Sequence, residues 1–176
     1  MQTPAFTAED FIAGALRGSH RALLQAVETL SQEELAWRPH PQAASAGFLL
    51  WHVARVQDAI LHRQLLAQPE LWITQGWAQR FDLPIYGTGQ DYSDIELSGF
   101  RVPPKTDILA YLEATSDAAL RGIEALDTRA LDMDTEEGLQ RVRYLVILVN
   151  HANMHAGSIN YIRDLLLASR EVSPEF

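Results

Sequence analysis

Residues 141–166, RVRYLVILVNHANMHAGSINYIRDLL, contain apolar side chains at helical spacing along their whole length. Apolar residues that recur at every third or fourth position predict an amphipathic α-helix, which we place over about residues 137–168. Two histidines, His151 and His155, lie on the same face as the apolar residues. The predicted buried side consists of Val142, Leu145, Leu148, Ala152, Ile159, Ile162 and Leu166.

Three further segments have the same pattern, over about residues 8–30, 46–66 and 104–126. Thr7 and Ser45 are candidate N-caps, and Pro104 suits a first helical turn. No strand pattern and no repeat is present. We therefore predict an all-α four-helix bundle, with residues 1–176 forming a single domain. The short link between the first two helices favours antiparallel neighbours, and the glycine- and proline-containing residues 79–103 predict a long crossover.

Composition excludes several classes of function. The chain has 176 residues, no cysteine and a formal net charge of -9. A disulfide, a thiolate nucleophile and an iron–sulfur site are therefore excluded. The acidic balance argues against nucleic acid as a partner. Because there is no long uncharged apolar run and no signal-peptide pattern, we expect no membrane association and a cytoplasmic location.

The arrangement of histidines is the main functional signal. His151 and His155 are four residues apart, so their side chains lie about one turn apart on a helix. His52 lies on the apolar face of the second helix, with Leu49, Val56 and Ala59. A bundle can bring these faces together, which would bury three imidazoles. The alternative is that they are core histidines whose ring nitrogens are bonded by backbone carbonyls, but burying three without a ligand is costly.

Three histidine ligands would leave coordination positions open for water or substrate, as in a catalytic metal site. Imidazole suits zinc, nickel, copper or iron, and among these we expect zinc or nickel ahead of iron. Ala152 stands where the zinc-protease motif has glutamate, so the pair of histidines is not that motif. Neither His151 nor His155 has a glutamate three residues before it, which argues against a carboxylate-bridged di-iron site.

Other polar and aromatic residues are interpreted structurally. His20 is expected at the bundle boundary, and His40 and His62 at the surface. Asp58 should face away from His52, which leaves no obvious base beside the histidines. Tyr161 and Arg163 should turn away from the ligand face.

The aromatics Trp51, Trp72, Trp77, Tyr86 and Tyr92 are interpreted as packing rather than as the roof of a pocket. The acidic run Asp127–Glu137 and the tail Ser169–Phe176 are expected to be a solvated loop and a frayed end.

Two stretches resemble the signatures of the DinB-like superfamily. FLLWHVARVQD (Phe48–Asp58) is similar to the helix-two signature, and NHANMHAGSINYIRDLL (Asn150–Leu166) is similar to the closing signature. Between them, TQGWAQRFDLPIYGTGQDYSDIELSGFR resembles the variable crossover region. The resemblance implies a bundle with a long crossover, a divalent metal on His52, His151 and His155, and a homodimer. Ser158 stands where the family usually has glutamine, which puts any role of that amide in doubt.

The resemblance includes S-transferases that use mycothiol or bacillithiol, and isomerases of maleylpyruvate type. We therefore expect a metal-dependent enzyme that activates a low-molecular-weight thiol for attack on a small electrophile. Two alternatives stay open. A metal-dependent hydrolase would use metal-bound water, and a non-catalytic module would bind a metal or small ligand without turnover. Beyond the three ligands, no catalytic residue is predicted.

Overall fold

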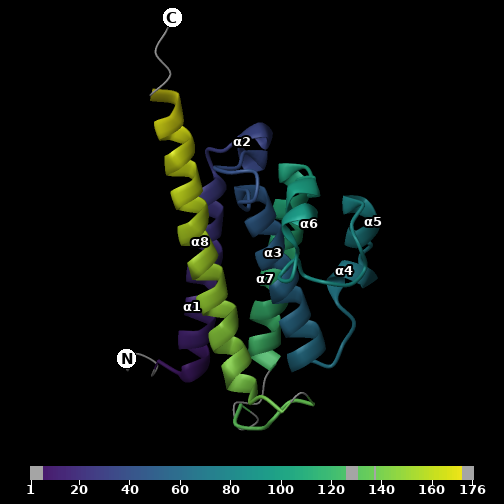
Figure 1. Cartoon of the computed structure of the whole chain (residues 1–176). Helices are drawn as coiled ribbons and strands as arrows, with labels where there is room; N and C mark the ends of the chain where they lie inside the picture. The colour runs from purple at the N-terminus through teal and green to yellow at the C-terminus, as the bar shows by residue number, and fades with distance from the viewer. Residues whose placement is uncertain (1–5, 126–130, 137, 172–176) are drawn as a thin grey trace, which may run out of the picture.

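Four long helices form a bundle in the computed structural model, which describes residues 6–125, 131–136 and 138–171 (Figure 1). They are α1 (Ala8–Val27), α3 (Ala46–Asp58), α7 (Lys105–Ala125) and α8 (Arg141–Glu171). α1 and α8 run in one direction, and α3 and α7 run in the other. Within these ranges there is no strand, only an isolated bridge between Asp134 and Gln140. The predicted all-α bundle is confirmed, and none of its described helices is long and apolar enough to cross a membrane.

The order of the helices around the bundle differs from one expectation. α1 packs mainly on α8 and α7, and α3 packs on the same two helices. α1 and α3 are therefore diagonal rather than adjacent. The link between them, which contains α2 (Gln32–Ala36), is long enough to cross the top of the bundle. The α3–α8 groove consequently lies on the opposite side of the bundle from the α1–α7 groove.

The crossover between α3 and α7 contains more helix than the sequence pattern indicated. α3 continues directly into a π-helix, η1 (Ala59–Leu65), where the Leu66 amide donates to the Leu61 carbonyl at 3.0 Å. Three short helices follow, α4 (Leu71–Thr74), α5 (Trp77–Phe81) and α6 (Asp94–Gly99). Trp72 of α4 packs on Trp51 of α3, and Tyr92 and Phe100, which flank α6, pack on Phe48 of α3. These contacts explain the aromatic content of this region. The crossover was expected, but the short helices α5 and α6 were not.

α3 is the central helix of the molecule. All of its residues are buried, because α2, α4, α7 and α8 surround it. Leu50, Val53 and Ala54 join α7 and α8 residues such as Leu112 and Ile159 in one core. A sequence pattern with one apolar face underestimates this burial. The consequence is that any polar side chain on α3 must find a partner inside the protein.

Predicted caps determine where the helices begin. Thr7 and Ser45 accept hydrogen bonds from Asp10 and Phe48 backbone amides at the starts of α1 and α3. The Lys105 ammonium donates to the carbonyls of Val27, Glu28 and Leu30, so it joins the start of α7 to the end of α1.

Some expectations concern residues outside the described ranges. These are Leu126 of the third predicted helix, Asp127 and Glu137 of the acidic run, and residues 172–176 of the tail. Within the described part, α8 extends through Ser169 to Glu171, so the predicted fraying at Ser169 is wrong.

Candidate metal site

Three imidazoles converge in the groove between α3 and α8. The Nε2 atom of His151 lies 3.1 Å from Nε2 of His52 and 3.2 Å from Nε2 of His155. One ligand nitrogen from each of the three lies within 4.8 Å of the others. His52 is buried, and the two α8 histidines are half-buried, so the cluster has access to solvent. Two helices that meet antiparallel thus bring together residues that are 99 positions apart.

His52 is held in one tautomer. Its Nδ1 atom lies 2.7 Å from the Thr88 carbonyl oxygen, which can only accept, so Nδ1 carries the proton and donates. The lone pair of His52 is therefore on Nε2, which faces the other two imidazoles. A bond from the far ring nitrogen to a backbone carbonyl is the usual way in which a histidine ligand is oriented.

The segment that supplies the carbonyl is shaped by two glycines. Gly87 and Gly89 have positive φ angles of 91° and 84°, which favour glycine. A Cβ atom on Gly89 would lie 2.6 Å from the Trp51 ring and 3.1 Å from Phe48. The backbone at Gly89 therefore packs directly on the aromatic face of α3. This contact brings the neighbouring Thr88 carbonyl within reach of His52.

The three imidazoles are uncharged at neutral pH. Burial and the neighbouring histidines lower the pKa of His151 to about 3 and that of His155 to about 4. Burial also lowers the pKa of His52, although its bond to the Thr88 carbonyl opposes this. Neutral imidazole is the form that binds a metal. Protons would therefore compete for these nitrogens only in acidic solution.

The cluster fits a metal ion better than it fits a hydrogen-bonded core. One proton can lie between only two of the three nitrogens, and the buried Nδ1 of His155 has no hydrogen-bond partner among the described residues. A cation among them would bond to all three lone pairs. In tetrahedral coordination with bonds of about 2.0–2.1 Å, ligand nitrogens lie about 3.3 Å apart. The two observed separations, 3.1 and 3.2 Å, are close to that value.

Comparison with known proteins identifies the family. The family model for the DinB superfamily matches residues 15–159, a range that includes all three histidines. The chain belongs to the DinB superfamily. The crystal structure of a conserved protein of Enterococcus faecalis superposes with a TM-score of 0.80 at 23% identity, covering 93% of this chain and 99% of that one. None of the curated proteins compared with the chain matches it.

Membership in the DinB superfamily is thus confirmed, and the structural likeness supports the fold. The position that departs from the expected family signature, Ser158, donates to the Met154 carbonyl of its own helix at 3.1 Å. The Ser158 hydroxyl therefore bonds within α8 rather than to the three imidazoles.

This DinB-superfamily chain also contains a buried ionic network beside the histidines. The Arg55 guanidinium lies 2.8 Å from Glu70, 3.5 Å from Asp58 and 3.1 Å from the Tyr111 hydroxyl. His62 lies 2.7 Å from Asp58, and the carboxylate raises the pKa of this histidine although burial opposes the effect. The expectation that His62 lies at the surface is wrong, because its side chain is buried against the Asp58 carboxylate. The sequence feature that could have revealed this buried network was the charged pair Arg55 and Asp58 inside an apolar helix.

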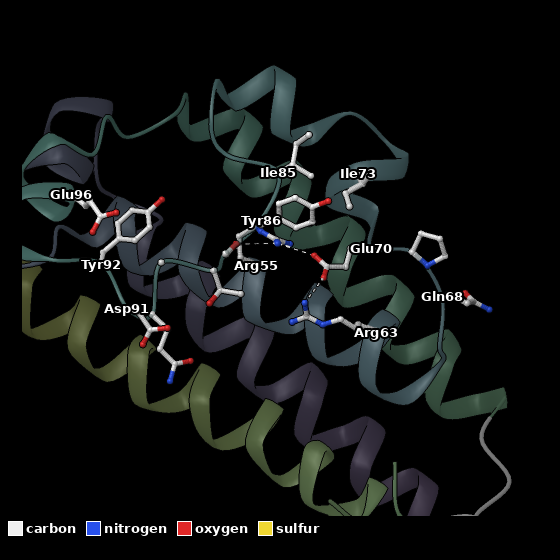
Figure 2. Close-up of a pocket in the computed structure, with 15 residues that line it drawn as sticks. Arg55, Arg63, Gln68, Glu70, Ile73, Ile85, Tyr86, Asp91, Tyr92 and Glu96 are labelled. Carbon is white, nitrogen blue, oxygen red and sulfur yellow. Dashed lines mark hydrogen bonds and ion pairs between the residues drawn. The ribbon is translucent and has the colours of Figure 1, made fainter. Parts of the chain in front are cut away.

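A hollow of about 590 Å³ lies over this network. Figure 2 shows Glu70 between the guanidiniums of Arg55 and Arg63, with Tyr86 beside them and Tyr92 and Glu96 at the other end. Gly87, Thr88 and Gly89 form part of its wall. The segment that orients His52 is therefore also a wall of this hollow.

The remaining expectations are mostly confirmed. His40 is exposed, and half-buried His20 contacts the Ser116 hydroxyl of α7 at 2.7 Å. Trp51, Trp72 and Trp77 are core residues, whereas Tyr86 is exposed and Tyr92 half-buried, both in the wall of the hollow. Asp58 bonds to the Leu71 and Trp72 amides and to Tyr111, not to the three imidazoles. Tyr161 is exposed, and Arg163 pairs with Asp164.

Proposed function

We propose that the protein is a metal-dependent enzyme of the thiol S-transferase type, with His52, His151 and His155 as ligands. The convergence of three neutral Nε2 atoms at 3.1 and 3.2 Å is the observation that supports it. A divalent cation held there would supply Lewis acidity that favours the thiolate form of a low-molecular-weight thiol. The chain has no cysteine, so this thiol has to come from a second molecule.

The surrounding residues support a transferase more than a hydrolase with a protein base. The buried carboxylates near α3 are Asp58 and Glu70, and both are bound to Arg55. Asp58 also accepts from the Leu71 and Trp72 backbone amides. Within the part of the chain that the structure describes, neither carboxylate bonds to the imidazoles, so neither is placed to take a proton from a nucleophile there. The three histidines of this chain would hold the cation, and their partial exposure would leave it accessible to solvent.

The first test is metal content. We expect about one zinc or nickel ion per chain in purified protein without an affinity tag, measured by plasma mass spectrometry. His151→Ala should lose most of it, because two nitrogens hold an ion far less tightly than three. His20→Ala is the matched control, since His20 contacts Ser116 and not the cluster. An unchanged metal content in His151→Ala would contradict the ligand assignment.

The second test is thiol dependence. We expect the metal-loaded protein to convert an aryl halide only when mycothiol, bacillithiol or another small thiol is added, with the rate followed by absorbance. Hydrolysis of ester or amide substrates without thiol would indicate the hydrolase instead. Tight metal binding without turnover would indicate a binding module.

A further inference from the structure

Two neighbouring carbonyls of one short segment bind two residues of the same helix. Nη2 of Arg55 donates to the Gly87 carbonyl at 3.2 Å, and Nδ1 of His52 donates to the Thr88 carbonyl at 2.7 Å. Residues three apart on a helix lie on neighbouring parts of its surface, so α3 reaches residues 87–89 with both side chains at once. We propose that Arg55 is a positioning residue for the metal site, which acts by holding this segment so that Thr88 orients His52. The inference rests on the proposed metal site.

Arg55 is rigid enough for this role. Its side chain is 2% exposed, and Glu70 and Tyr111 bind the two terminal nitrogens of its guanidinium. The guanidinium carbon also lies 4.6 Å from the centre of the Trp72 ring, in cation–π contact. The freedom of a long side chain is therefore already lost before it binds the Gly87 carbonyl. A fixed donor can fix the carbonyl that it binds.

The segment needs such a contact. Gly87 is exposed, no atom lies near its hypothetical Cβ, and glycine allows more backbone conformations than any other residue. Gly89 is held on the other side by its packing against Trp51 and Phe48. Thr88 lies between these two anchors. If the Arg55 anchor is lost, the Thr88 carbonyl can turn, and His52 loses the acceptor that keeps its lone pair on Nε2.

The test is Arg55→Lys, with two readouts that do not depend on turnover. Lysine keeps the buried positive charge beside Glu70 and Asp58, but it lacks the planar fork that also reaches Gly87. We expect about a tenfold weaker zinc affinity, measured by competition with a chelator. In the metal-free protein we expect ¹⁵N NMR to show a mixture of His52 tautomers in place of one Nδ1-protonated form.

The matched control is Arg63→Met. Arg63 lines the same hollow and lies 3.7 Å from the same Glu70, but it is largely exposed and no bond joins it to residues 87–89. Its zinc affinity and its His52 tautomer should equal those of the wild type. Equal losses in Arg63→Met and Arg55→Lys would show that the effect is not specific to the bond between Arg55 and the Gly87 carbonyl, and would overturn the proposal.

A second variant leaves the ionic network intact. Gly89→Ala places a Cβ 2.6 Å from Trp51 and pushes the segment outward without touching Arg55, so it should produce the same two losses. Gly138→Ala is its control, because φ there is +77° and the space around it is open. If Arg55→Lys fails to fold, this pair of variants tests whether the position of residues 87–89 sets the zinc affinity and the tautomer of His52.

The outcomes are distinct. Wild-type zinc affinity together with an unchanged His52 tautomer in Arg55→Lys, or in Gly89→Ala if the lysine variant does not fold, would overturn the proposal. If the wild-type protein binds no zinc, the proposed function fails. The tautomer of His52 in the metal-free protein still tests the role of Arg55 in that case.

Discussion

At the scale of single residues, the same side-chain type has opposite environments in this molecule. His151 and His155 face other imidazoles, whereas His62 faces the Asp58 carboxylate. The sequence predicted the first environment, because histidines on two apolar faces had to meet in a bundle. It did not predict the second, because His62 does not fall on the apolar face that contains His52, whereas η1 packs on both α7 and α8.

We expect the histidines to titrate separately in metal-free protein. His151 and His155 should titrate near pH 3 and 4, and His62 above its usual 6.5, in a ¹H–¹⁵N NMR titration.

The unfolded chain binds protons to the cluster more tightly than the folded one. The contribution of the cluster to stability is therefore full above about pH 6.5 and falls as the pH drops toward 3. His62 contributes below pH 6.5, and its contribution is lost as pH rises through its raised pKa. A single titration near 6.5 for all of them would contradict this assignment.

At the scale of elements, Asp58 connects three helices. Its carboxylate accepts from the Leu71 and Trp72 amides at the start of α4 at 2.9 and 2.7 Å, and from the Tyr111 hydroxyl of α7 at 2.7 Å. These bonds lower its pKa although burial opposes the effect. The end of α3 is thereby tied to the crossover that carries residues 87–89.

Asp58→Ala should lower the free energy of unfolding by about 3–5 kcal/mol, because it leaves the Leu71 and Trp72 amides without their acceptor and removes one of the two carboxylates beside the buried Arg55. Urea denaturation followed by circular dichroism measures this. The control is Asp164→Ala, whose pair with Arg163 is at the surface and contributes about 0–1 kcal/mol. Equal effects of the two substitutions would show that the buried network adds no stability.

Periodicity and caps predicted the long helices to within a few residues, because each long helix has an apolar face and both α1 and α3 have a polar N-cap. They failed in the crossover, where α4, α5 and α6 are too short to show a period. They also could not reveal Thr88 as the partner of His52, since a backbone carbonyl has no sequence signature. The three imidazoles were predictable, but the structure that orients one of them was not.

At the scale of the whole molecule, α1 and α8 leave an apolar face exposed. Phe11, Val146 and Val149 line a hollow of about 420 Å³ there, and Phe11 and Val146 are 66% and 54% exposed. Exposed apolar faces of this kind are typical of protein interfaces. The homodimer expected from the sequence stays a prediction, and we place it on this face.

We expect the protein to be a dimer by light scattering after gel filtration, and Val146→Glu to shift it toward monomer. Met133→Glu is the matched control, because Met133 is 60% exposed but does not line this hollow. Both variants should keep the circular dichroism of the wild type. A monomeric wild-type protein at micromolar concentration would contradict the prediction.

The spacing of the three histidines also has a consequence for unfolding. His151 and His155 are one turn apart on a single helix, whereas His52 is 99 residues from His151. A denatured chain keeps the local pair as a weak chelate but loses the distant ligand. Bound metal would therefore raise the stability of the native state by less than its full binding free energy, since part of that affinity survives unfolding. With a metal bound, His52 would be the ligand that couples the ion to the fold.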